Sequence, residues 1–520
     1  MRAHRTRPRW YAVAAILVLL AAIAAPPVAA DDISESKGFR KAVTLAGIRA
    51  HQQALQNIAD ANGGTRLAGT AGYDESAEYV YDKAVAAGYV VSTQEFTFQL
   101  VSDVSPPVFA QTAPTPTTYV DGVDFMTATY SGSGDNTRPV SVPSGDNRGC
   151  FAADFAGFPA GNIALVLRGT PAGFPGGACT FRIKATNAVA AGASAVIIYN
   201  NAPGAPAFTL AEPRFTNSVI GITQALGLQL AALVPGGLTV RVKTETTAEN
   251  RTAVNVIAET PGGDPNNVVV VGAHLDSVSR GPGINDNGSG SAAILEIAEI
   301  YSAQRRTPRN KIRFMWFGAE EQGLIGSTRH VASLNQAERD KIMAMLNFDM
   351  IGSPNYMRGV YDGDGDPTGI AGPPGSEFIE DVFVDYFNSQ NLANEPTLFS
   401  GRSDYGPFIA AGIPAGGLFT GAEQPKTAAQ QALYGGTVGA QLDPCYHLAC
   451  DTFAGTDSGA GATAPGLGLQ ALDEMSDAVA HGVLTLSRTK VDITAVASPA
   501  LRTSGSPARV DFEAHEAVDH

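Results

Sequence analysis

A short apolar strand that runs straight into potential metal ligands is the feature that most constrains this chain. Val268–Val271 is followed within a few residues by His274 and Asp276, and a glycine-rich loop then delivers Asp286 to the start of a helical pattern. Neutral imidazole and carboxylate are ligand types that suit zinc. Residues 271–287 therefore predict half of a metal site, held on a strand–loop–helix unit.

Strand-like and helix-like segments alternate through residues 253–487. Apolar runs at 267–272, 312–317 and 345–350 have the length of buried strands, and helical periodicity lies between them. This alternation predicts an α/β fold with an open, largely parallel sheet sandwiched by helices. Residues 38–98 show a similar pattern, and we expect them to belong to the same domain.

Two later segments end in carboxylates. The run Ile312–Gly318 is followed by Glu320 and Glu321. Because neighbouring side chains on extended backbone diverge, one carboxylate can bind a metal while the other faces a metal-bound water. Asp349 closes an apolar strand, where a cation would offset the cost of burying the carboxylate. Taken alone, the pair Glu320 and Glu321 is better explained as a solvated acidic turn, and Asp349 is explained equally well as a helix N-cap.

A further ligand candidate lies in the segment DPCYHLAC. Tyr446 and His447 stand between two cysteines, and a disulfide there would hold both side chains rigidly. A lone histidine in such a loop could also be purely structural. Three other histidines lie in helical patterns, where we expect surface positions: His51, His330 and His481.

Considered together, the candidates point to one site. Ligands bind at the carboxyl edge of such sheets, and two histidines, two aspartates and two glutamates fall at strand ends or in pinned loops of this region. Five ligands with one shared carboxylate suit two zinc ions about 3.5–4 Å apart. The sequence thus predicts a two-zinc hydrolytic centre.

Residues 1–30 have the pattern of a secretory signal: four arginines, an apolar stretch and a small-residue cleavage site, Val-Ala-Ala. The alternative is a membrane anchor, but the apolar stretch is short for a span and ends in two prolines. We therefore expect a secreted, extracellular protein with no membrane span after cleavage.

The four cysteines fit this location. In an exported protein a sparse, even set indicates two local disulfides, Cys445–Cys450 and Cys150–Cys179; four free thiols are the alternative. The formal charge is −15, and it becomes −19 without the four arginines of the leader. Such a charge argues against nucleic acid or an anionic membrane as partner.

Residues 102–245 differ in composition from the segments that flank them. Serine, proline, threonine and glycine dominate at first, and a compact α/β pattern follows. The stretches NIALVLRG, CTFRIKATNAVAAGASAVIIYNN and SVIGIT resemble a protease-associated (PA) domain. The resemblance implies a domain inserted into the surrounding one, which could bind a partner or shade the active site.

The surrounding domain closely resembles the secreted di-zinc aminopeptidases of bacteria and aminopeptidase Y. The motifs that carry the resemblance are GAHLDSV, GINDNGSG, FMWFGAEEQGLIGS, NFDMIG, GRSDYGPF and DPCYHLACDT. It implies a catalytic domain at 31–101 plus 246–488 around the PA domain at 102–245. The signal peptide at 1–30 precedes this domain, and a tail at 489–520, rich in serine, alanine, proline and charge, follows it and is expected to be mobile.

The resemblance also implies a role for each ligand. His274 and Asp349 bind one zinc ion, Glu321 and His447 bind the other, and Asp286 bridges both. Every one of these positions matches the family pattern.

Further roles come from the same resemblance. Glu320 is the general base, and Tyr446 helps to stabilise the oxyanion. Asp276 stands behind the ligands and orients His274 through the second imidazole nitrogen. A cis peptide bond follows Asp286.

The resemblance implies a substrate pocket as well. Met350, Gly401 and Phe419 match apolar pocket positions, and the segment around Arg402 completes the end of the pocket. The expected substrates are peptides or proteins with a free N-terminus, and the expected first residue is large and hydrophobic. In some relatives a carboxylate pair such as Asp473 and Asp477 binds calcium together with the mature N-terminus, here Asp32-Ile33.

Three alternatives remain open. A carboxypeptidase of the same superfamily would need a cationic cluster for the substrate carboxylate, and Arg402 is the one obvious candidate. A glutaminyl cyclase would use one zinc ion and lack the first histidine ligand, which is present here. A receptor or peptide-binding protein on this fold would have lost metal ligands, whereas this chain keeps all five.

Overall fold

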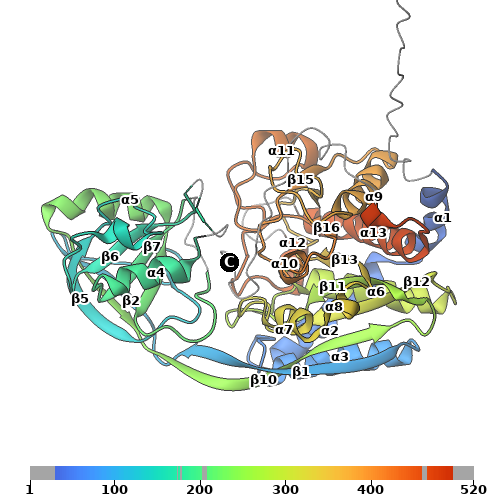
Figure 1. The fold of residues 1–520 in the computed structure, drawn as a ribbon, viewed down its shortest axis with the longest axis horizontal. Coiled ribbons are helices and arrows are strands. Elements are labelled where there is room, and N and C mark those ends of the chain that lie inside the picture. Colours follow the sequence, from blue (N-terminus) through green and yellow to red (C-terminus); the bar gives the residue numbers. More distant parts are fainter. Residues whose placement is uncertain (1–29, 172–173, 176–178, 202–207, 459–464, 496–520) are drawn as a thin grey trace, which may run out of the picture.

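The chain folds into two lobes joined by a long two-stranded ribbon (Figure 1). This computed structural model describes residues 30–171, 174–175, 179–201, 208–458 and 465–495. Apart from Ala30, the expected signal peptide lies outside these residues, as does the expected tail beyond residue 495.

The large lobe contains an eight-stranded sheet in the order β1-β10-β12-β11-β13-β16-β14-β15. Its central strands β12, β11, β13 and β16 run parallel, as the alternating pattern predicted, while β1 and β10 add an antiparallel edge. The strands are β1 Val90–Asp103, β10 Thr246–Glu259, β11 Asp264–His274, β12 Asn310–Phe317, β13 Ile342–Phe348, β14 Gly359–Tyr361, β15 Glu395–Thr397 and β16 Ala415–Phe419.

Both faces of this sheet are covered by helices, because the side chains of each strand alternate between them. On β11, Val269 and Val271 join the core formed with α6, α9 and α13, whereas Val268 and Val270 join the core formed with α7 and α10. The helices are α1 Ala30–Arg40, α2 Leu45–Ala61, α3 Ala71–Ala86, α6 Gly288–Ala303, α7 Ile325–Ser333, α8 Gln336–Arg339, α9 Ser376–Ser389, α10 Tyr405–Ala410, α11 Ala428–Tyr434, α12 Phe453–Ser458 and α13 Leu467–Arg488, with a 3₁₀ turn η3 Ile493–Ala495.

The ribbon that connects the lobes consists of β1 and β10, which pair antiparallel from Val90 opposite Glu259 to Asp103 opposite Thr246. Beyond its end lies the small lobe, whose sheet has the order β3-β2-β9-β5-β6-β7-β8-β4. Its elements are β2 Val108–Ala113, β3 Thr117–Thr118, β4 Phe125–Thr127, β5 Gly134–Ser141, η1 Ala152–Phe155, β6 Ile163–Leu167, α4 Phe181–Ala190, β7 Ala195–Tyr199, β8 Ser218–Ile222, α5 Gln224–Leu233, η2 Val234–Gly236 and β9 Thr239–Thr244.

Two disulfides, Cys150–Cys179 and Cys445–Cys450, are formed as the sequence predicted. Within the described part of the chain, no helix combines the length and apolar character that crossing a bilayer requires.

The expectation that three helical histidines lie at the surface was wrong. His51, His330 and His481 are 4%, 4% and 0% exposed. Each is buried because a partner from another element meets its ring: Tyr79 for His51, Gln94 for His330 and Ser36 for His481. Helical periodicity alone does not reveal such partners.

Candidate metal centre

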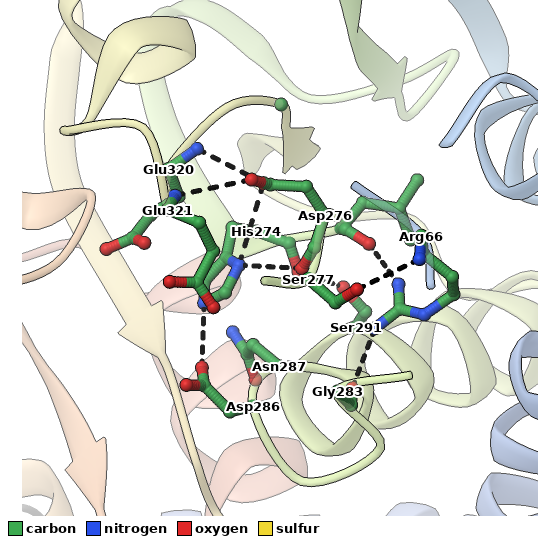
Figure 2. A network of polar contacts seen from close by, with 12 residues as sticks. Arg66, His274, Asp276, Ser277, Gly283, Asp286, Asn287, Ser291, Glu320 and Glu321 are labelled. Carbon is green, nitrogen blue, oxygen red and sulfur yellow. Dashed lines mark hydrogen bonds and ion pairs between the residues drawn. The ribbon is translucent and has the colours of Figure 1, made fainter. Parts of the chain in front are cut away.

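The ligand candidates meet at the carboxyl edge of the central parallel strands. His274 is the last residue of β11, Glu320 and Glu321 follow β12, and Asp349 follows β13 directly. Since parallel strands end at the same edge, these side chains converge there. The loop before α6 brings Asp286 to the same place (Figure 2).

One group of ligands forms around His274. Its Nε2 atom lies 3.2 Å from Oδ1 of Asp286 and 3.2 Å from Oδ1 of Asp349. Glu320 belongs to this group, since one of its carboxylate oxygens lies within 4.8 Å of the His274 and Asp349 ligand atoms. All four side chains are buried.

A second group forms around His447 and shares a member with the first. The His447 Nε2 atom lies 3.2 Å from Oδ2 of Asp286 and 3.1 Å from Oε2 of Glu321. The two oxygens of Asp286 therefore contact two different imidazoles. The peptide bond between Asp286 and Asn287 is cis.

Burial and crowding shift the acidity of the whole site. Burial raises the pKa of Glu320, and Asp349 and Glu321 raise it further, well above its usual range. Burial likewise raises the pKa of Glu321 to about 7. So many carboxyl groups can stay ionised together only beside positive charge.

The pKa of His447 is raised and the pKa of Asp286 is lowered, so both groups favour their charged forms. Burial lowers the pKa of His447, but the Glu321 and Asp286 carboxylates outweigh it and raise the pKa to about 10. Burial raises the pKa of Asp286, but its two histidine partners outweigh this and hold it well below the usual range. The site is thus arranged for cations at two positions, one beside each histidine.

Asp276 connects the two groups, although not quite as expected. The imidazole Nδ1 of His274 lies 3.2 Å from the Asp276 backbone carbonyl oxygen and 3.7 Å from its carboxylate. The carboxylate itself accepts hydrogen bonds from the backbone N–H groups of Glu320 and Glu321, at 3.1 and 3.2 Å (Figure 2). Asp276 therefore orients three functional residues at once.

A fully buried arginine beneath the site was not foreseen from the sequence. Arg66 is 0% exposed, and its guanidinium donates to the backbone carbonyls of Leu275 and Pro282. It also donates to the backbone carbonyl of Gly283 (Figure 2). These carbonyls belong to the loop between His274 and Asp286. The arginine thereby fixes the path of the segment that carries two ligand candidates.

Gly283 shows how tightly that loop is folded. Its φ is +62°, and an added Cβ would lie 2.2 Å from the Asp286 carbonyl oxygen. The loop is held from the other side by Asp451, whose carboxylate accepts from the backbone N–H groups of Asn285 and Asp286, at 2.7 and 2.9 Å. Asp451 also lay outside the sequence prediction.

Asp349 is oriented by a short chain of hydrogen bonds. The Ser403 hydroxyl donates to Oδ2 of Asp349 at 2.7 Å, and the side-chain amide of Asn347 donates to Ser403 at 2.8 Å. One oxygen of Asp349 therefore faces His274 while the other is committed to Ser403.

The expected pocket residues lie close to this edge. The Thr420 N–H donates to the Met350 carbonyl at 2.9 Å, which brings the segments of Phe419 and Met350 together. The Gly401 N–H is held by the Tyr405 hydroxyl at 3.0 Å.

Arg402 is engaged on both sides. It pairs with Glu423 at 2.6 Å and donates to the Tyr446 hydroxyl at 3.2 Å. The Tyr446 ring stacks on the His447 imidazole, with ring centroids 3.8 Å apart. Burial raises the pKa of Tyr446 well above its usual range, so the phenol keeps its proton.

The expected calcium pair lies on α13, away from this centre. Asp477 is ion-paired with Arg40 at 3.7 Å, and Asp473 is exposed. Neither belongs to a cluster of metal-ligand side chains among the described residues. Side chains that could hold a metal also gather at two other places, His51–Glu296–Glu299 and Asp362–Asp364–Glu380.

Comparison with known proteins gives two family matches. The model of peptidase family M28 matches residues 255–482, and the model of the PA domain matches residues 137–230. The second match lies within the small lobe.

Two curated relatives align over most of the chain. An aminopeptidase of Pseudomonas aeruginosa is 43% identical over 484 residues, which cover 88% of this chain and 84% of that protein. Leucine aminopeptidase 2 of Trichophyton rubrum is 39% identical over 440 residues, which cover 84% and 83% respectively.

Two solved structures align over most of the chain. The aminopeptidase from Aneurinibacillus sp. strain AM-1 superimposes with a TM-score of 0.66 at 28% identity, covering 87% of this chain and 96% of that one. BSAP, a zinc aminopeptidase from Bacillus subtilis, gives a TM-score of 0.58 at 25% identity, covering 85% and 94%.

Proposed function

The chain belongs to peptidase family M28 and is a zinc-dependent aminopeptidase, and we propose that it works with two zinc ions held by His274, Asp286, Glu321, Asp349 and His447. The observation that carries the proposal is the position of Asp286, whose two oxygens lie 3.2 Å from two different imidazoles. A carboxylate shared in this way suits a ligand that bridges two ions.

The donor set fits zinc. Each histidine offers one Nε2 atom and meets a carboxylate of its own besides Asp286. In addition, Oε1 of Glu321 is buried and has no hydrogen-bond partner among the described residues, which leaves it available to a cation. Imidazole and carboxylate oxygen are the usual zinc ligands outside thiolate sites.

When bound, zinc supplies Lewis-acid polarisation of the scissile carbonyl and acidifies the attacking water. Glu320 is the group placed to take the proton of that water and to return one to the departing amine. Its raised pKa suits an acid–base role. Tyr446, protonated and oriented by Arg402, can donate to the oxygen that becomes negative.

The free amino group of the substrate needs acceptors nearby, and Glu320 and Asp349 offer them. The side chain of the first residue would then lie against Met350, Gly401 and Phe419. These surroundings, together with the fungal relative named leucine aminopeptidase 2, support a preference for large hydrophobic residues. The ion pair of Arg402 with Glu423 neutralises the cation that was the obvious candidate to bind a substrate carboxylate, which argues against a carboxypeptidase.

Secretion and a calcium site are the two remaining parts of the proposal. The signal-like residues 1–30 and the two disulfides support secretion. A calcium ion at Asp473 and Asp477 stays a prediction, to be tested by whether calcium raises the melting temperature and whether Asp473→Asn abolishes that rise.

The first experiment compares leucyl peptides that are unblocked, N-acetylated or C-amidated. The purified protein should release leucine from the unblocked and amidated peptides alone, and it should lose this activity on chelation and regain it with zinc. Cleavage of the acetylated peptide would exclude an aminopeptidase.

The second experiment counts zinc. The wild type should hold two ions per chain, and Asp286→Asn should hold fewer with much lower affinity. Glu320→Gln is the matched control: it should keep two ions while kcat falls about 10²–10⁴-fold, because it removes proton transfer rather than a ligand. One ion in the wild type, or unchanged kcat in Glu320→Gln, would contradict the proposal.

A further inference from the structure

A second set of side chains of the types that bind zinc lies where helices α2 and α6 pack against each other. His51 comes from α2, and Glu296 and Glu299 come from α6, about two to three turns beyond the helix start that borders the metal centre. The imidazole Nε2 atom lies 3.6 Å from Oε2 of Glu296 and 3.4 Å from Oε2 of Glu299. The two glutamates are three residues apart, so they share one face of α6. The proposed mechanism uses none of these three side chains.

The distances in this set fit a zinc ion better than direct hydrogen bonds. Zinc bonds to imidazole nitrogen and carboxylate oxygen are about 2.0–2.2 Å long, so tetrahedral geometry places neighbouring ligand atoms about 3.3–3.6 Å apart. The separations of 3.4 and 3.6 Å agree with this, whereas a charge-assisted hydrogen bond would be about 2.7–2.9 Å long. The other ring nitrogen, Nδ1, lies 2.7 Å from the Tyr79 hydroxyl, which orients Nε2 toward the carboxylates. Metal-binding histidines are usually held through their second nitrogen in this way.

The carboxylate of Glu296 has the fewest partners in this set. Glu296 is 7% exposed, and the 3.6 Å contact with His51 is the closest polar contact of its carboxylate within the described part of the chain. A buried carboxylate is costly unless a cation lies beside it. Helix α2 leaves room for this group, because an added Cβ on Gly47 would collide with Oε1 of Glu296. Glycine weakens a helix, and here it admits a charged side chain.

The set is accessible to solvent on one side. Glu299 keeps 29% of its side chain exposed, and its Oε1 atom lies 3.5 Å from Nζ of Lys83, which is also exposed. The second oxygen of Glu299, Oε2, faces His51. An ion can therefore enter from the surface, and water can occupy the fourth position of a tetrahedral site.

We propose that His51, Glu296 and Glu299 bind a third divalent cation of the zinc type, which joins α2 to α6. The loop that carries Arg66 follows α2, and α6 follows the bridging aspartate, so the ion connects the two helices that flank the ligand loop. Its role is to stabilise this pair of helices, not to take part in the chemistry. It is held more weakly than the ions of the metal centre, because one of its three ligands is partly exposed and also pairs with Lys83. The site does not depend on the proposed function.

The test counts zinc on the full-length enzyme in two conditions. After gel filtration in zinc-free buffer the wild type should keep the two ions of the metal centre, and at equilibrium with excess zinc it should hold three and show a higher melting temperature. Glu299→Gln removes a ligand at the exposed edge. This variant should hold two ions in both conditions, show no rise in melting temperature and release leucine like the wild type. Glu78→Gln, at an exposed position of helix α3, is the matched control and should behave as the wild type.

A second variant leaves all three ligands in place. Gly47→Ala should displace the Glu296 carboxylate and lower the affinity for the third ion about tenfold or more, while alanine favours the helix itself. Gly38→Ala is its matched control, because an added Cβ there has no neighbour within 4 Å. A wild type that holds only two ions in excess zinc, or a third ion that both Glu299→Gln and Gly47→Ala retain at full affinity, would overturn the site. A protonated imidazole between two carboxylates would then explain the set.

Discussion

At the scale of single residues, the site depends on groups that never reach the substrate. Arg66 is buried, and its charge lies among the carboxylates of Asp276, Asp451, Asp286 and Glu321. Burial lowers the pKa of Arg66 and these carboxylates oppose that shift, which leaves the pKa at about 10, so the guanidinium remains charged at neutral pH. It both holds the ligand loop and offsets acidic charge.

We expect Arg66→Met to destabilise the protein by about 3–5 kcal/mol, because three backbone carbonyls and several carboxylates would lose their buried cation. Chemical denaturation with zinc present measures this. Arg305→Met, at an exposed position, should change stability by less than about 0.5 kcal/mol. Equal unfolding free energies of the two variants would show that the buried contacts of Arg66 do not stabilise the protein.

Asp276→Asn should separate orientation from metal binding. The amide keeps the size of the side chain but can accept through only one oxygen, so the backbone N–H of either Glu320 or Glu321 loses its partner. We expect two zinc ions to remain at saturating zinc and kcat to fall about 10–100-fold. An Asp276→Asn variant with the kcat of the wild type would show that Asp276 does not orient the catalytic residues.

At the scale of elements, each disulfide serves a different part of the fold. Cys445 and Cys450 are five residues apart and enclose His447, whereas Cys150 and Cys179 are 29 apart and lie in the small lobe. Loop-closure entropy assigns about 2 kcal/mol to the first and about 3–4 kcal/mol to the second. The shorter one therefore matters more for the metal centre than for global stability.

Two double-alanine variants test this division. Replacing Cys150 and Cys179 should lower the melting temperature more and leave zinc affinity unchanged. Replacing Cys445 and Cys450 should lower zinc affinity, since His447 would lose its rigid loop. Calorimetry measures the melting temperature of each variant, and zinc titration measures its zinc affinity. A loss of zinc affinity in the Cys150/Cys179 variant, or a larger drop in melting temperature in the Cys445/Cys450 variant, would contradict this division.

Helix α13 carries a pH-sensitive contact with α1 and α9. His481 bonds Ser36, stacks on Tyr386 and is 0% exposed. Burial, and to a lesser extent Arg40, lowers the pKa of His481 to about 4. Because the unfolded chain takes up the proton near pH 6.5, stability is complete above that pH and is lost as the pH falls toward 4.

This contact predicts an acid-sensitive step on the order of 3 kcal/mol between pH 6.5 and 4. In His481→Gln the difference in unfolding free energy between pH 7 and 4.5 should shrink by most of that amount. Comparing the two pH values within each variant cancels the constant cost of the substitution. If the difference in unfolding free energy between the two pH values is as large in His481→Gln as in the wild type, another titrating group causes the loss of stability in acid.

At the scale of the whole molecule, the catalytic lobe could be predicted well and the relation between the lobes could not. His274 and Asp349 could be predicted because each lies at the end of an apolar strand, and topology fixes the edge where parallel strands end. The role of Arg66 could not be predicted because its partners are backbone carbonyls more than 200 residues away in the chain. Such partners leave no trace in residue type or spacing.

The features between the lobes could not be predicted from the sequence for a related reason. The cavity between the lobes, lined by Thr127 and His447, depends on how the ribbon orients the small lobe relative to the large one. No local sequence pattern encodes that orientation.

The ribbon also has a consequence for how this molecule tolerates change. Asp103 and Thr246 face each other at its outer end, so the chain leaves the catalytic lobe and re-enters it at neighbouring points. To the catalytic lobe, the 142 intervening residues are equivalent in connectivity to the turn of a hairpin. Since closing a longer loop adds only about 0.6 kcal/mol per doubling of length, the inserted lobe can be exchanged, enlarged or shortened in evolution while the metal-binding edge keeps its register.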